Sequence, residues 1–393
     1  MHFADNRNKI GKYIPAVVFL IFIYGMALWF IFSPKPDYSS SEKRYLQKFP
    51  EVTAEKLLSG DFGSEFETFF ADRFPQRNTW VGLNAYTALA EGNNGASGVY
   101  NCKNGYLINK PVSTENNLDK NIGAVADFAK SIDTPTTVML VPSTGYIVDD
   151  VLPTFHDKYN DDEDISKISS TLSKDKIGFV DLRERFKSEY KNGSQLYYKT
   201  DHHWTTKGAY TGYQELCKTL GITPIDDSTL KKDSYPDFYG TTYSSSGFWL
   251  TPPDNIEIWN NPKNSDRNIS VKITEGANIK TSGSMYFTDH LKEDDKYPVF
   301  IDGNHALTEI TNTNAKNGTI LLIKDSFSHS LAPFLAENYS KVVLVDLRYY
   351  KESVSDLVTA YNPEQVVVLY GIDNLEPIRI SYGSSKFFNI QLN

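Results

Sequence analysis

The strongest feature of the hydrophobic pattern is a run of 20 uncharged, mostly apolar residues, 13–32, near the N-terminus. At a helical rise of about 1.5 Å per residue, such a run spans a hydrocarbon core about 30 Å thick. Arg7, Lys9 and Lys12 precede it, and the positive-inside rule places this flank in the cytoplasm. We therefore expect an uncleaved membrane anchor over 1–33, with the rest of the chain outside. A cleaved signal peptide is the alternative, although no small-x-small site follows the run.

The pattern changes twice after the anchor. Residues 34–41 contain two Pro and three Ser, which is typical of an extended linker, so a catalytic domain is expected over 42–393. The first part of that domain carries phenylalanines at helical intervals, which predicts a helical lead-in that packs on the body. This helical segment ends in charged residues, Asp72, Arg73 and Arg77. We interpret them as a solvated, salt-bridged helix end.

The domain then alternates short apolar runs with amphipathic segments, after a hairpin whose turn is expected at Asn104-Gly105. The expected elements are a helix over 113–130 with Ser113 or Thr114 as N-cap, strand 137–141, helix 163–174, strand 177–180, strand 320–323, helix 328–337, strand 341–345, helix 351–361 and strand 365–369. Such alternation predicts an α/β fold with a parallel sheet. Residues 222–318 break the rhythm with short β-like runs among polar residues, which predicts a β-rich insertion or cap.

Polar residues follow each of the last three predicted strands, and in a parallel sheet the carboxyl ends of the strands form the site. Ser326 comes just after strand 320–323, at a turn into a helix. A serine hydroxyl there lies beside backbone N–H groups that can hold an oxyanion. An N-cap is the alternative role for this serine.

The segment 200–204, Thr-Asp-His-His-Trp, supplies the groups that a serine nucleophile needs. A serine hydroxyl needs a histidine to take its proton, and that histidine needs a carboxylate to fix its tautomer and stabilise the imidazolium. Asp201 and His203 can supply both from one loop. The residues therefore favour a catalytic triad of Ser326, His203 and Asp201.

Two alternatives are open for the same segment. It could be an ordinary polar, solvent-facing loop, or it could be a metal site, because Asp-His-His also occurs in a class of manganese-dependent phosphoesterases. Those enzymes need further carboxylate motifs to complete a dinuclear centre. Asp149-Asp150 and Asp161-Asp162 lie in loop runs without a matching ligand pattern. We therefore expect no metal and no other cofactor.

The amino-acid composition limits the classes of molecule that this protein is expected to bind. The formal net charge is -9 and the pI is near 5.4, and Lys and Arg form no cluster, which argues against nucleic acid as the main partner. The 25 Tyr and 23 Phe suit stacking on sugar faces as well as packing. Cys102 and Cys217 are too few for a disulfide framework and form either one bridge or two buried thiols.

Thr-Asp-His-His-Trp at 200–204 together with Lys-Asp-Ser-Phe at 324–327 resembles the Asp-His-His-Trp family. This family is similar to the periplasmic alginate O-acetyltransferases and, more distantly, to the SGNH hydrolases. The resemblance covers nearly the whole chain after the anchor and extends to the segments 72–77, 141–142, 151–153, 300–304 and 346–350. It implies an SGNH-hydrolase-like parallel sheet flanked by helices, with Ser326 as nucleophile, His203 as base and Asp201 as its orienting carboxylate.

The chain departs from the SGNH pattern at one residue and in the order of its motifs. Lys324 stands where the Gly-Asp-Ser block has a small residue. The Asp/His block precedes the Ser block, which is the permuted order of the alginate-type relatives, and triad geometry does not depend on chain order. Asn374 resembles the asparagine of the Gly-x-Asn block, whose amide donates to the oxyanion; a turn-forming asparagine is the alternative.

Three further residues are candidates for substrate contacts at the same edge of the sheet. Arg348 suits an acidic sugar or the environment of an acyl intermediate, and a structural salt bridge to Asp346 is its alternative. Tyr349 follows directly and is expected at the same rim. Trp204 is interpreted mainly as packing that fixes the loop, with a sugar platform as the alternative.

The family resemblance implies a bacterial, extracytoplasmic O-acyltransferase, with acetyl as the expected group, that modifies a secreted or cell-surface polysaccharide of an exopolysaccharide or biofilm system. A multispanning membrane-bound O-acyltransferase is the expected acyl donor and the polysaccharide is the acceptor. A carbohydrate acetylesterase with the same triad is one alternative. A non-catalytic glycan-binding or scaffold component is the other.

Overall fold

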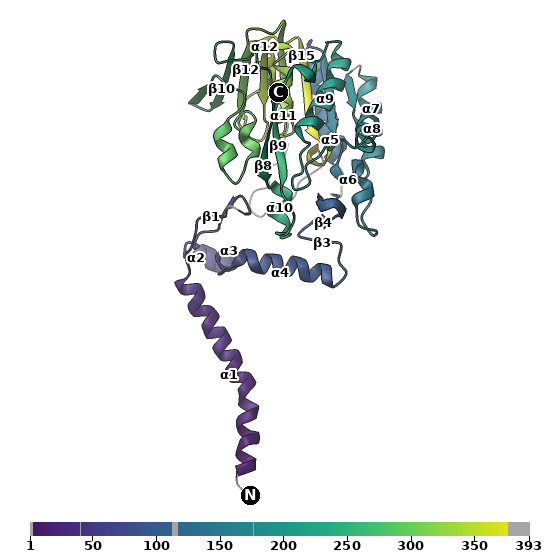
Figure 1. Ribbon diagram of the computed structural model, residues 1–393. Helices are drawn as coiled ribbons and strands as arrows, with labels where there is room; N and C mark the ends of the chain where they lie inside the picture. The colour runs from purple at the N-terminus through teal and green to yellow at the C-terminus, as the bar shows by residue number, and fades with distance from the viewer. Residues whose placement is uncertain (1–2, 40, 112–116, 176, 376–393) are drawn as a thin grey trace. The chain divides into compact units, whose positions relative to one another are not determined.

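The computed structural model describes residues 3–39, 41–111, 117–175 and 177–375, with the side chains described from Tyr13 onward (Figure 1). The chain divides into two compact units, residues 1–87 and 88–393. The expected N-cap at Ser113 or Thr114 lies outside the described residues. The domain boundaries that the sequence suggested, at 33 and 41, remain predictions.

The first unit is helical. Its elements are α1 (Phe3–Phe32), β1 (Tyr38–Ser39), β2 (Arg44–Tyr45), α2 (Ala54–Ser59), α3 (Asp61–Asp72) and α4 (Arg77–Ala90), which crosses into the second unit. Among described residues, one helix is long and apolar enough to cross a membrane, over Tyr13–Phe32. That helix fits a single-pass anchor or a signal sequence.

The charged cluster at the end of α3 is buried. Asp72 and Arg73 are each 5% exposed. Asp72 accepts hydrogen bonds from both Nη atoms of Arg44 at 2.9 and 2.5 Å, and Arg77 pairs with Glu42. Although burial opposes ionisation, the bonds from Arg44 hold the pKa of Asp72 below its usual value. The salt bridges were expected, but the expectation that the cluster is solvated was wrong.

The second unit is an α/β domain. Its strands are β3 (Gly95–Ala96), β4 (Val99–Asn101), β5 (Leu107–Asn109), β6 (Thr136–Val141), β7 (Gly178–Asp181), β8 (Lys231–Phe238), β9 (Asp254–Asn260), β10 (Ile269–Glu275), β11 (Asn278–Ser282), β12 (Leu307–Asn312), β13 (Asn317–Lys324), β14 (Tyr339–Val345) and β15 (Gln365–Gly371). Its helices are α5 (Asn117–Ser131), α6 (Thr144–Ile147), α7 (Asp161–Lys174), α8 (Arg183–Lys191), α9 (Thr206–Leu220), α10 (Thr241–Ser246), α11 (Ser328–Leu335), α12 (Val354–Tyr361) and α13 (Ile372–Leu375).

The central sheet has eight strands in the order β11-β10-β12-β14-β13-β15-β6-β7. The five strands from β14 to β7 are parallel to one another, and β12 pairs antiparallel with β14. The mostly parallel, helix-flanked sheet that the sequence predicted is therefore confirmed. The β-rich region was also predicted, and part of it completes this sheet as β10, β11 and β12, whereas β8 and β9 form a separate hairpin.

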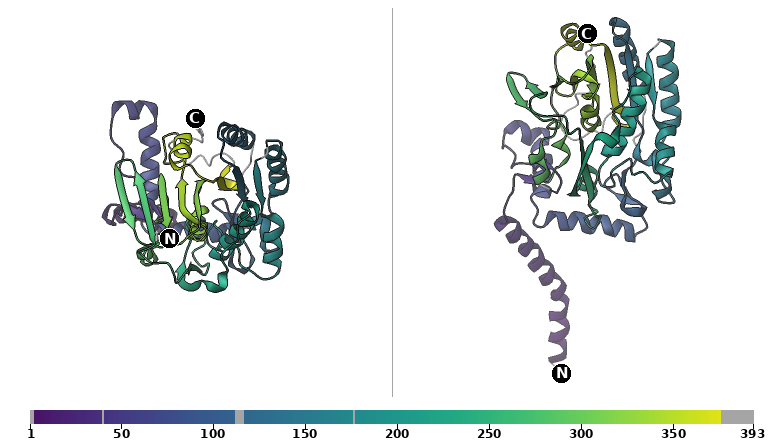
Figure 2. Two further views of the ribbon diagram at one scale, coloured as in Figure 1. Left: turned by 90° about the horizontal axis from the view of Figure 1, so that it is seen from above. Right: turned by 45° about the horizontal axis from the view of Figure 1, so that its top comes forward.

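Alternate residues of each parallel strand enter two different cores, as the two-residue period of a strand requires. In β15, Val367 and Leu369 belong to the core with α8, α9 and α11, whereas Val366 and Val368 belong to the core with α5, α7 and α12. The view from above in Figure 2 shows helices on both faces of the sheet. Burial on both faces explains why these strands are continuous apolar runs in the sequence.

The two cysteines are free and buried. Burial raises the pKa of both thiols, to about 12 for Cys102 and about 12 for Cys217. Of the two states that the sequence left open, the structure therefore has two buried thiols.

Candidate active site

The turn that carries Ser326 follows the central strand β13. The backbone N–H of Asp325 still donates to Leu369 of the neighbouring β15, at 3.2 Å, and the chain then turns into α11. The carboxylate of Asp325 accepts the N–H of Phe327 at 2.9 Å and the N–H of Gly371 at 2.8 Å. These bonds fix the turn from both sides, so that Ser326 is placed by the sheet itself. Its side chain is largely buried, since the residue is 9% exposed.

The loop over 200–204 is fixed at both ends. At its start, the buried carboxylate of Asp254 accepts the N–H of Thr200 and its hydroxyl, both at 2.7 Å. At its end, α9 begins with Thr205 as N-cap, whose hydroxyl accepts the N–H of Gly208. Between them, Trp204 is fully buried, and its indole N–H donates to the carbonyl of Phe327 and the hydroxyl of Ser330. Trp204 thus ties the loop to α11 beside the serine turn.

The ties of this loop bring the three predicted triad residues together. His203 Nε2 lies 2.7 Å from Ser326 Oγ, and His203 Nδ1 lies 2.5 Å from Asp201 Oδ1. The same Asp201 oxygen accepts the backbone N–H of His203 at 2.9 Å. A carboxylate can only accept, so Nδ1 carries the imidazole proton and Nε2 is free to take the serine proton. All three residues are buried.

The second oxygen of Asp201 is held by a residue that sequence reasoning missed. Asp201 Oδ2 accepts the N–H of Thr241 at 2.6 Å and its hydroxyl at 3.1 Å. Gly240 precedes it, and a Cβ at that position would lie 2.1 Å from the Cβ of Asp201. The close approach of backbone and carboxylate therefore needs glycine.

An aromatic ring covers the imidazole. Tyr297 stacks on His203 with 4.0 Å between ring centroids and 10° between planes, and its hydroxyl donates to the carbonyl of Ser326 at 3.1 Å. Phe327 meets the imidazole at 5.0 Å, close to edge-on. These two rings restrict the imidazole to one orientation. No spacing or motif in the sequence marks Tyr297 or Thr241, because each begins a short helical segment inside the β-rich region, Tyr297–Val299 and α10.

Lys324, the departure from the Gly-Asp-Ser block, points into a buried charged cluster behind the serine turn. Its Nζ donates to His329 Nε2 at 2.8 Å and to Asp346 at 3.1 Å. Burial lowers the pKa of Lys324 and lowers that of His329 well below its usual value, so His329 is neutral. Burial opposes the ionisation of Asp346, but the hydrogen bond from Arg348 and the charge of Lys324 hold its pKa low. The turn thus accommodates lysine because its charge is compensated.

The residues proposed for substrate and oxyanion contacts are Arg348, Tyr349 and Asn374. Arg348 makes two hydrogen bonds to Asp346, at 2.9 and 2.6 Å, so it occupies the structural salt bridge considered from the sequence. Tyr349 is 48% exposed beside it. The amide of Asn374 donates to Asp325 at 2.7 Å, and among described residues it has no contact with the serine hydroxyl. Its roles at the oxyanion, and those of Arg348 and Tyr349 toward substrate, remain predictions.

Trp204 fits the packing role rather than the sugar platform. A platform needs an exposed ring face, and the exposed fraction of Trp204 is 0%. Its neighbour His202 is partly exposed and its Nδ1 lies 2.7 Å from the hydroxyl of Thr241.

Asp201, His202 and His203 are also the metal-like cluster found among the described residues, with ligand atoms within 4.8 Å of one another. These atoms are directed at other groups. His203 Nε2 faces the serine hydroxyl, His203 Nδ1 faces Asp201, and His202 Nδ1 faces a threonine. Dinuclear sites also need several further carboxylates. The arrangement fits a hydrogen-bonded triad better than a metal centre.

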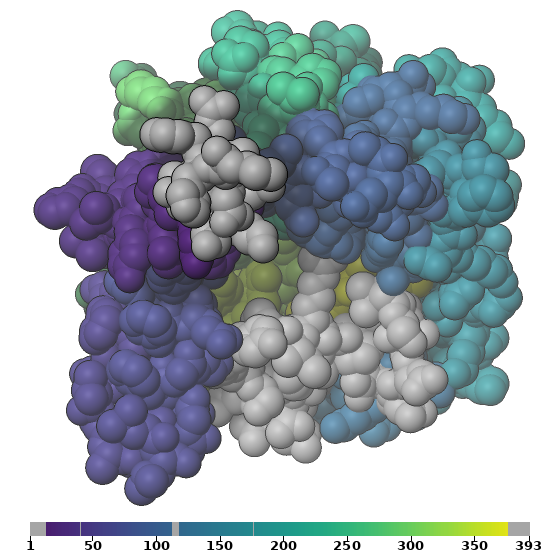
Figure 3. Space-filling model, turned by 90° about the horizontal axis from the view of Figure 1, so that it is seen from below, coloured from purple at the N-terminus to yellow at the C-terminus, as the bar shows by residue number. Residues whose placement is uncertain are grey.

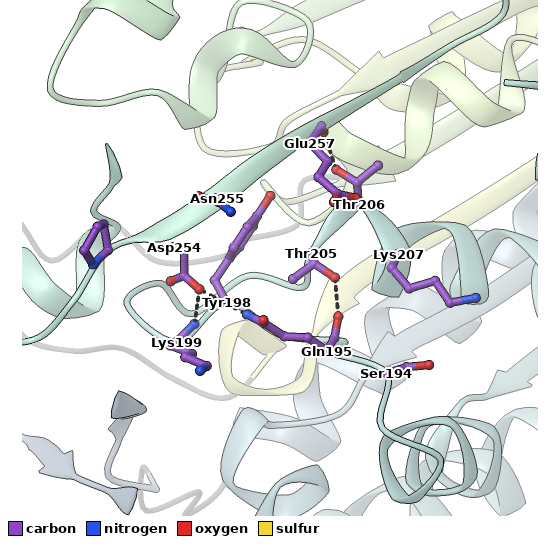
Figure 4. A pocket seen from close by; sticks show the side chains of 11 residues that line it. Ser194, Gln195, Tyr198, Lys199, Thr205, Thr206, Lys207, Asp254, Asn255 and Glu257 are labelled. Carbon is purple, nitrogen blue, oxygen red and sulfur yellow. Dashed lines mark hydrogen bonds between the residues drawn. The ribbon is translucent and has the colours of Figure 1, made fainter. Parts of the chain in front are cut away.

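A cavity of about 370 Å³ lies beside the loop (Figure 4). Its lining is mostly polar and comes from both flanks of the loop, from the start of β9 and from the proline before it, namely Ser194, Gln195, Tyr198, Lys199, Thr205, Thr206, Lys207, Pro253, Asp254, Asn255 and Glu257. In Figure 4 the two lysines lie on opposite sides of the cavity. The three triad side chains are not among the lining residues.

Comparison with known protein families gives one match. The sequence model of the family described as DHHW protein matches residues 112–345. No curated protein sequence matches the chain.

Two of the solved structures below share the fold at low sequence identity. A DHHW family protein from Eubacterium siraeum is 18% identical with a TM-score of 0.61, over 72% of this chain and 93% of its own. PatB1 of Bacillus cereus, solved with a sulfonyl adduct, is 21% identical with a TM-score of 0.59, over 70% of this chain and 95% of its own. The O-acetyltransferase domain of Pseudomonas putida AlgJ is 14% identical with a TM-score of 0.45, over 71% and 92%.

The family match covers more than half of the chain and includes the loop at 200–204 and the serine turn. This chain therefore belongs to the DHHW family.

Proposed function

We propose that this protein is an extracytoplasmic O-acyltransferase, with acetyl as its acyl group, that modifies a secreted or cell-surface polysaccharide through an acyl-Ser326 intermediate. The observation that carries the proposal is the continuous hydrogen-bonded chain from Ser326 Oγ through His203 to Asp201, with distances of 2.7 and 2.5 Å. A serine in such a chain is an activated nucleophile.

The first half-reaction transfers the acyl group to the enzyme. Ser326 Oγ attacks the carbonyl carbon of the donor while His203 Nε2 takes the hydroxyl proton, and Asp201 stabilises the imidazolium that forms. The C–O bond to the leaving group breaks, and His203 returns the proton to that group. In the second half-reaction His203 takes a proton from a sugar hydroxyl, whose oxygen attacks the acyl carbon. The bond from that carbon to Ser326 Oγ breaks, and His203 returns the proton to Oγ.

The oxyanion of the intermediate needs donors that are already in place. The backbone N–H of Ser326 makes no hydrogen bond to any residue that the structure describes. It is therefore available to the oxyanion at the start of α11, where the helix dipole also favours negative charge. Asp325 takes one of the two N–H groups of the Asn374 amide, and the other N–H group is our candidate second donor to the oxyanion.

The proposed location follows from the apolar helix. If α1 is an uncleaved anchor, Arg7, Lys9 and Lys12 keep the N-terminus inside and place the triad outside the membrane. Soluble acetyl donors are not expected there. We therefore propose a multispanning membrane-bound O-acyltransferase as the donor, as the family resemblance implies, and a polysaccharide as the acceptor.

The test uses the detergent-solubilised full chain with p-nitrophenyl acetate, with and without neutral or acidic oligosaccharides, and mass spectrometry of the sugars. The proposal predicts acetylated sugar that is absent with Ser326→Ala. Ser328→Ala is the matched control, because its buried hydroxyl lacks a hydrogen-bond partner among described residues. Serine-dependent acetate release without acetylated sugar would favour a carbohydrate esterase. No serine-dependent release would favour a non-catalytic glycan-binding protein.

A further inference from the structure

The helices that follow α1 within the first unit carry apolar side chains but bury almost none of them. Helix α2 has no buried residue, and the buried residue of α3 is Asp72. Ten large apolar residues beyond α1 in this unit are exposed: Tyr38, Tyr45, Phe49, Val52, Leu57, Leu58, Phe66, Phe70, Trp80 and Leu83. The described part of the much longer second unit exposes four: Phe155, Leu250, Ile279 and Tyr349. Such a concentration marks an interaction surface.

The aromatic residues of α3 lie along one side of the helix and are either exposed, as Phe66 and Phe70 are, or half-buried. Phe62, Phe66, Phe69 and Phe70 follow the helical period, and Phe49 packs edge-on against three of them. We call these five rings the aromatic face. Ser64 and Thr68, which lie on the opposite side of α3, are exposed and polar. The helix is therefore amphipathic, yet its apolar side lacks a protein core to cover it among the described residues.

The aromatic face touches the outer end of the apolar helix. Phe30, in the last turn of α1, packs against Phe70 at 4.7 Å and against Phe69 at 6.2 Å between ring centroids. Phe30 belongs to the 20-residue apolar span Tyr13–Phe32. If that span crosses the membrane, residues that touch Phe30 lie at the depth where the hydrocarbon core meets the headgroups. Amphipathic helices that lie in the membrane interface place Trp, Phe and Leu side chains at that depth.

Hydrogen bonds from the buried Arg73 hold α3 to the residues that follow α1. Arg73 donates to the carbonyls of Lys35 and Pro36, both at 2.7 Å, and to the carboxylate of Asp37 at 2.9 Å. It also donates to the carbonyl of Gln47 at 2.9 Å. The arginine thus fixes the residues just beyond the apolar span to the end of α3. If the span crosses the membrane, this link sets the depth of α3 relative to the bilayer. In the space-filling view from below, the indigo surface of α2 and α3 is open to the viewer beside the purple α1 (Figure 3).

We propose that α2 and α3 lie in the outer interface of the lipid bilayer, with the aromatic face toward the acyl chains and Ser64 and Thr68 toward water. The proposal rests on the anchoring role proposed for α1, and its occupant is lipid. An interfacial helix of this kind lies parallel to the membrane and buries its apolar side by about 5–10 Å. It would hold the start of the catalytic unit at the membrane surface, where a membrane-bound acyl donor delivers its group.

The experiment places one nitroxide label on the full chain in lipid nanodiscs. Cys102 and Cys217 are buried, so an introduced surface cysteine is labelled selectively. Phe66→Cys and Ser64→Cys are the matched pair. They are two positions apart in α3, and side chains at that spacing point about 160° apart around a helix. Leu58→Cys is a second apolar-side position; this residue is 91% exposed, so the change removes almost no packing.

Power saturation with oxygen and with a water-soluble nickel chelate gives the depth of each label. The proposal predicts severalfold higher oxygen than nickel accessibility at Phe66→Cys and Leu58→Cys, and the reverse at Ser64→Cys. High nickel accessibility at all three positions would overturn it. So would labels at the apolar positions that neither reagent reaches, since these would indicate a protein partner. Intact mass shows whether α1 is retained: its loss would overturn the anchor as well, whereas water-exposed labels with α1 present would overturn only this inference.

Discussion

Replacing Asp201 by asparagine separates the charge of the carboxylate from its shape. The carboxylate accepts at least four hydrogen bonds, two from His203 through Oδ1 and two from Thr241 through Oδ2. An asparagine has one oxygen and one NH₂ group, so one pair of donors must face an NH₂ group. If the NH₂ faces His203, the imidazole proton moves to Nε2, which can then no longer take the proton of Ser326. If it faces Thr241, the backbone N–H at 2.6 Å is left without an acceptor.

Both orientations also remove the charge that stabilises the imidazolium. The equivalent change in serine hydrolases with this triad lowers kcat about 10⁴-fold, which corresponds to about 5 kcal/mol of transition-state stabilisation. We expect the same order for Asp201→Asn. The free energy of unfolding should fall by less, about 1–3 kcal/mol, because one buried N–H is left without a hydrogen-bond acceptor.

The assay is Ser326-dependent release of p-nitrophenolate under single-turnover conditions, with thermal unfolding measured on the same samples. Thr241→Val is the control, since it keeps the backbone bond to Asp201 but removes the two hydroxyl contacts, to Asp201 at 3.1 Å and to His202 at 2.7 Å. We expect a loss of no more than about tenfold, of the order of one neutral hydrogen bond. An Asp201→Asn enzyme within tenfold of wild type would refute the proposed role of the carboxylate.

Three further predictions test the environment of the site. Gly240→Ala should lower kcat/KM by about 100-fold or more, because its Cβ would displace Asp201 and a shift of about 1 Å has that effect; unchanged kinetics would contradict the close approach. Burial and the charge of Asp373 raise the pKa of Asp161 to about 7. The native state therefore binds this proton more tightly than the unfolded state, and stability should fall by on the order of 4 kcal/mol from pH 4 to pH 8. In Asp161→Asn the free energy of unfolding, measured by denaturant titration, should change less between pH 4 and pH 8. The same pH dependence in wild type and variant would contradict a raised pKa at Asp161. Finally, EDTA should leave serine-dependent acetate release unchanged, whereas a loss restored by Mn²⁺ or Zn²⁺ would favour the metal alternative.

The hydrophobic pattern of the sequence was sufficient to predict the strands that are buried on both faces of the sheet. Strands β13, β14 and β15 are continuous apolar runs, and the structure extends each predicted strand by only a few residues at its ends. Helix α8 was not predicted, because Phe186 is its only buried residue and the segment is otherwise polar. The roles of β10 and β12 in the central sheet were also not evident, since an antiparallel edge depends on long-range pairing that no local pattern specifies.

At the site, the sequence indicated the reactive groups but not what holds them. Ser326, His203 and Asp201 follow from the chemistry that each residue type can do. Thr241 and Tyr297 contact the triad only because separate segments meet in space. The side chain of Lys324 could not be placed either, since its compensating partner Asp346 lies at the end of another strand.

The central claim is that Ser326 carries the acyl group. The direct measurement is peptide mass spectrometry of the full chain quenched within the first turnover of p-nitrophenyl acetate. We predict one acetyl group on the peptide that contains Ser326, present in wild type and Ser328→Ala, absent in Ser326→Ala, and lost faster when an acceptor oligosaccharide is added. Acetyl groups found only on lysines, or equal labelling of the Ser326→Ala chain, would contradict the account.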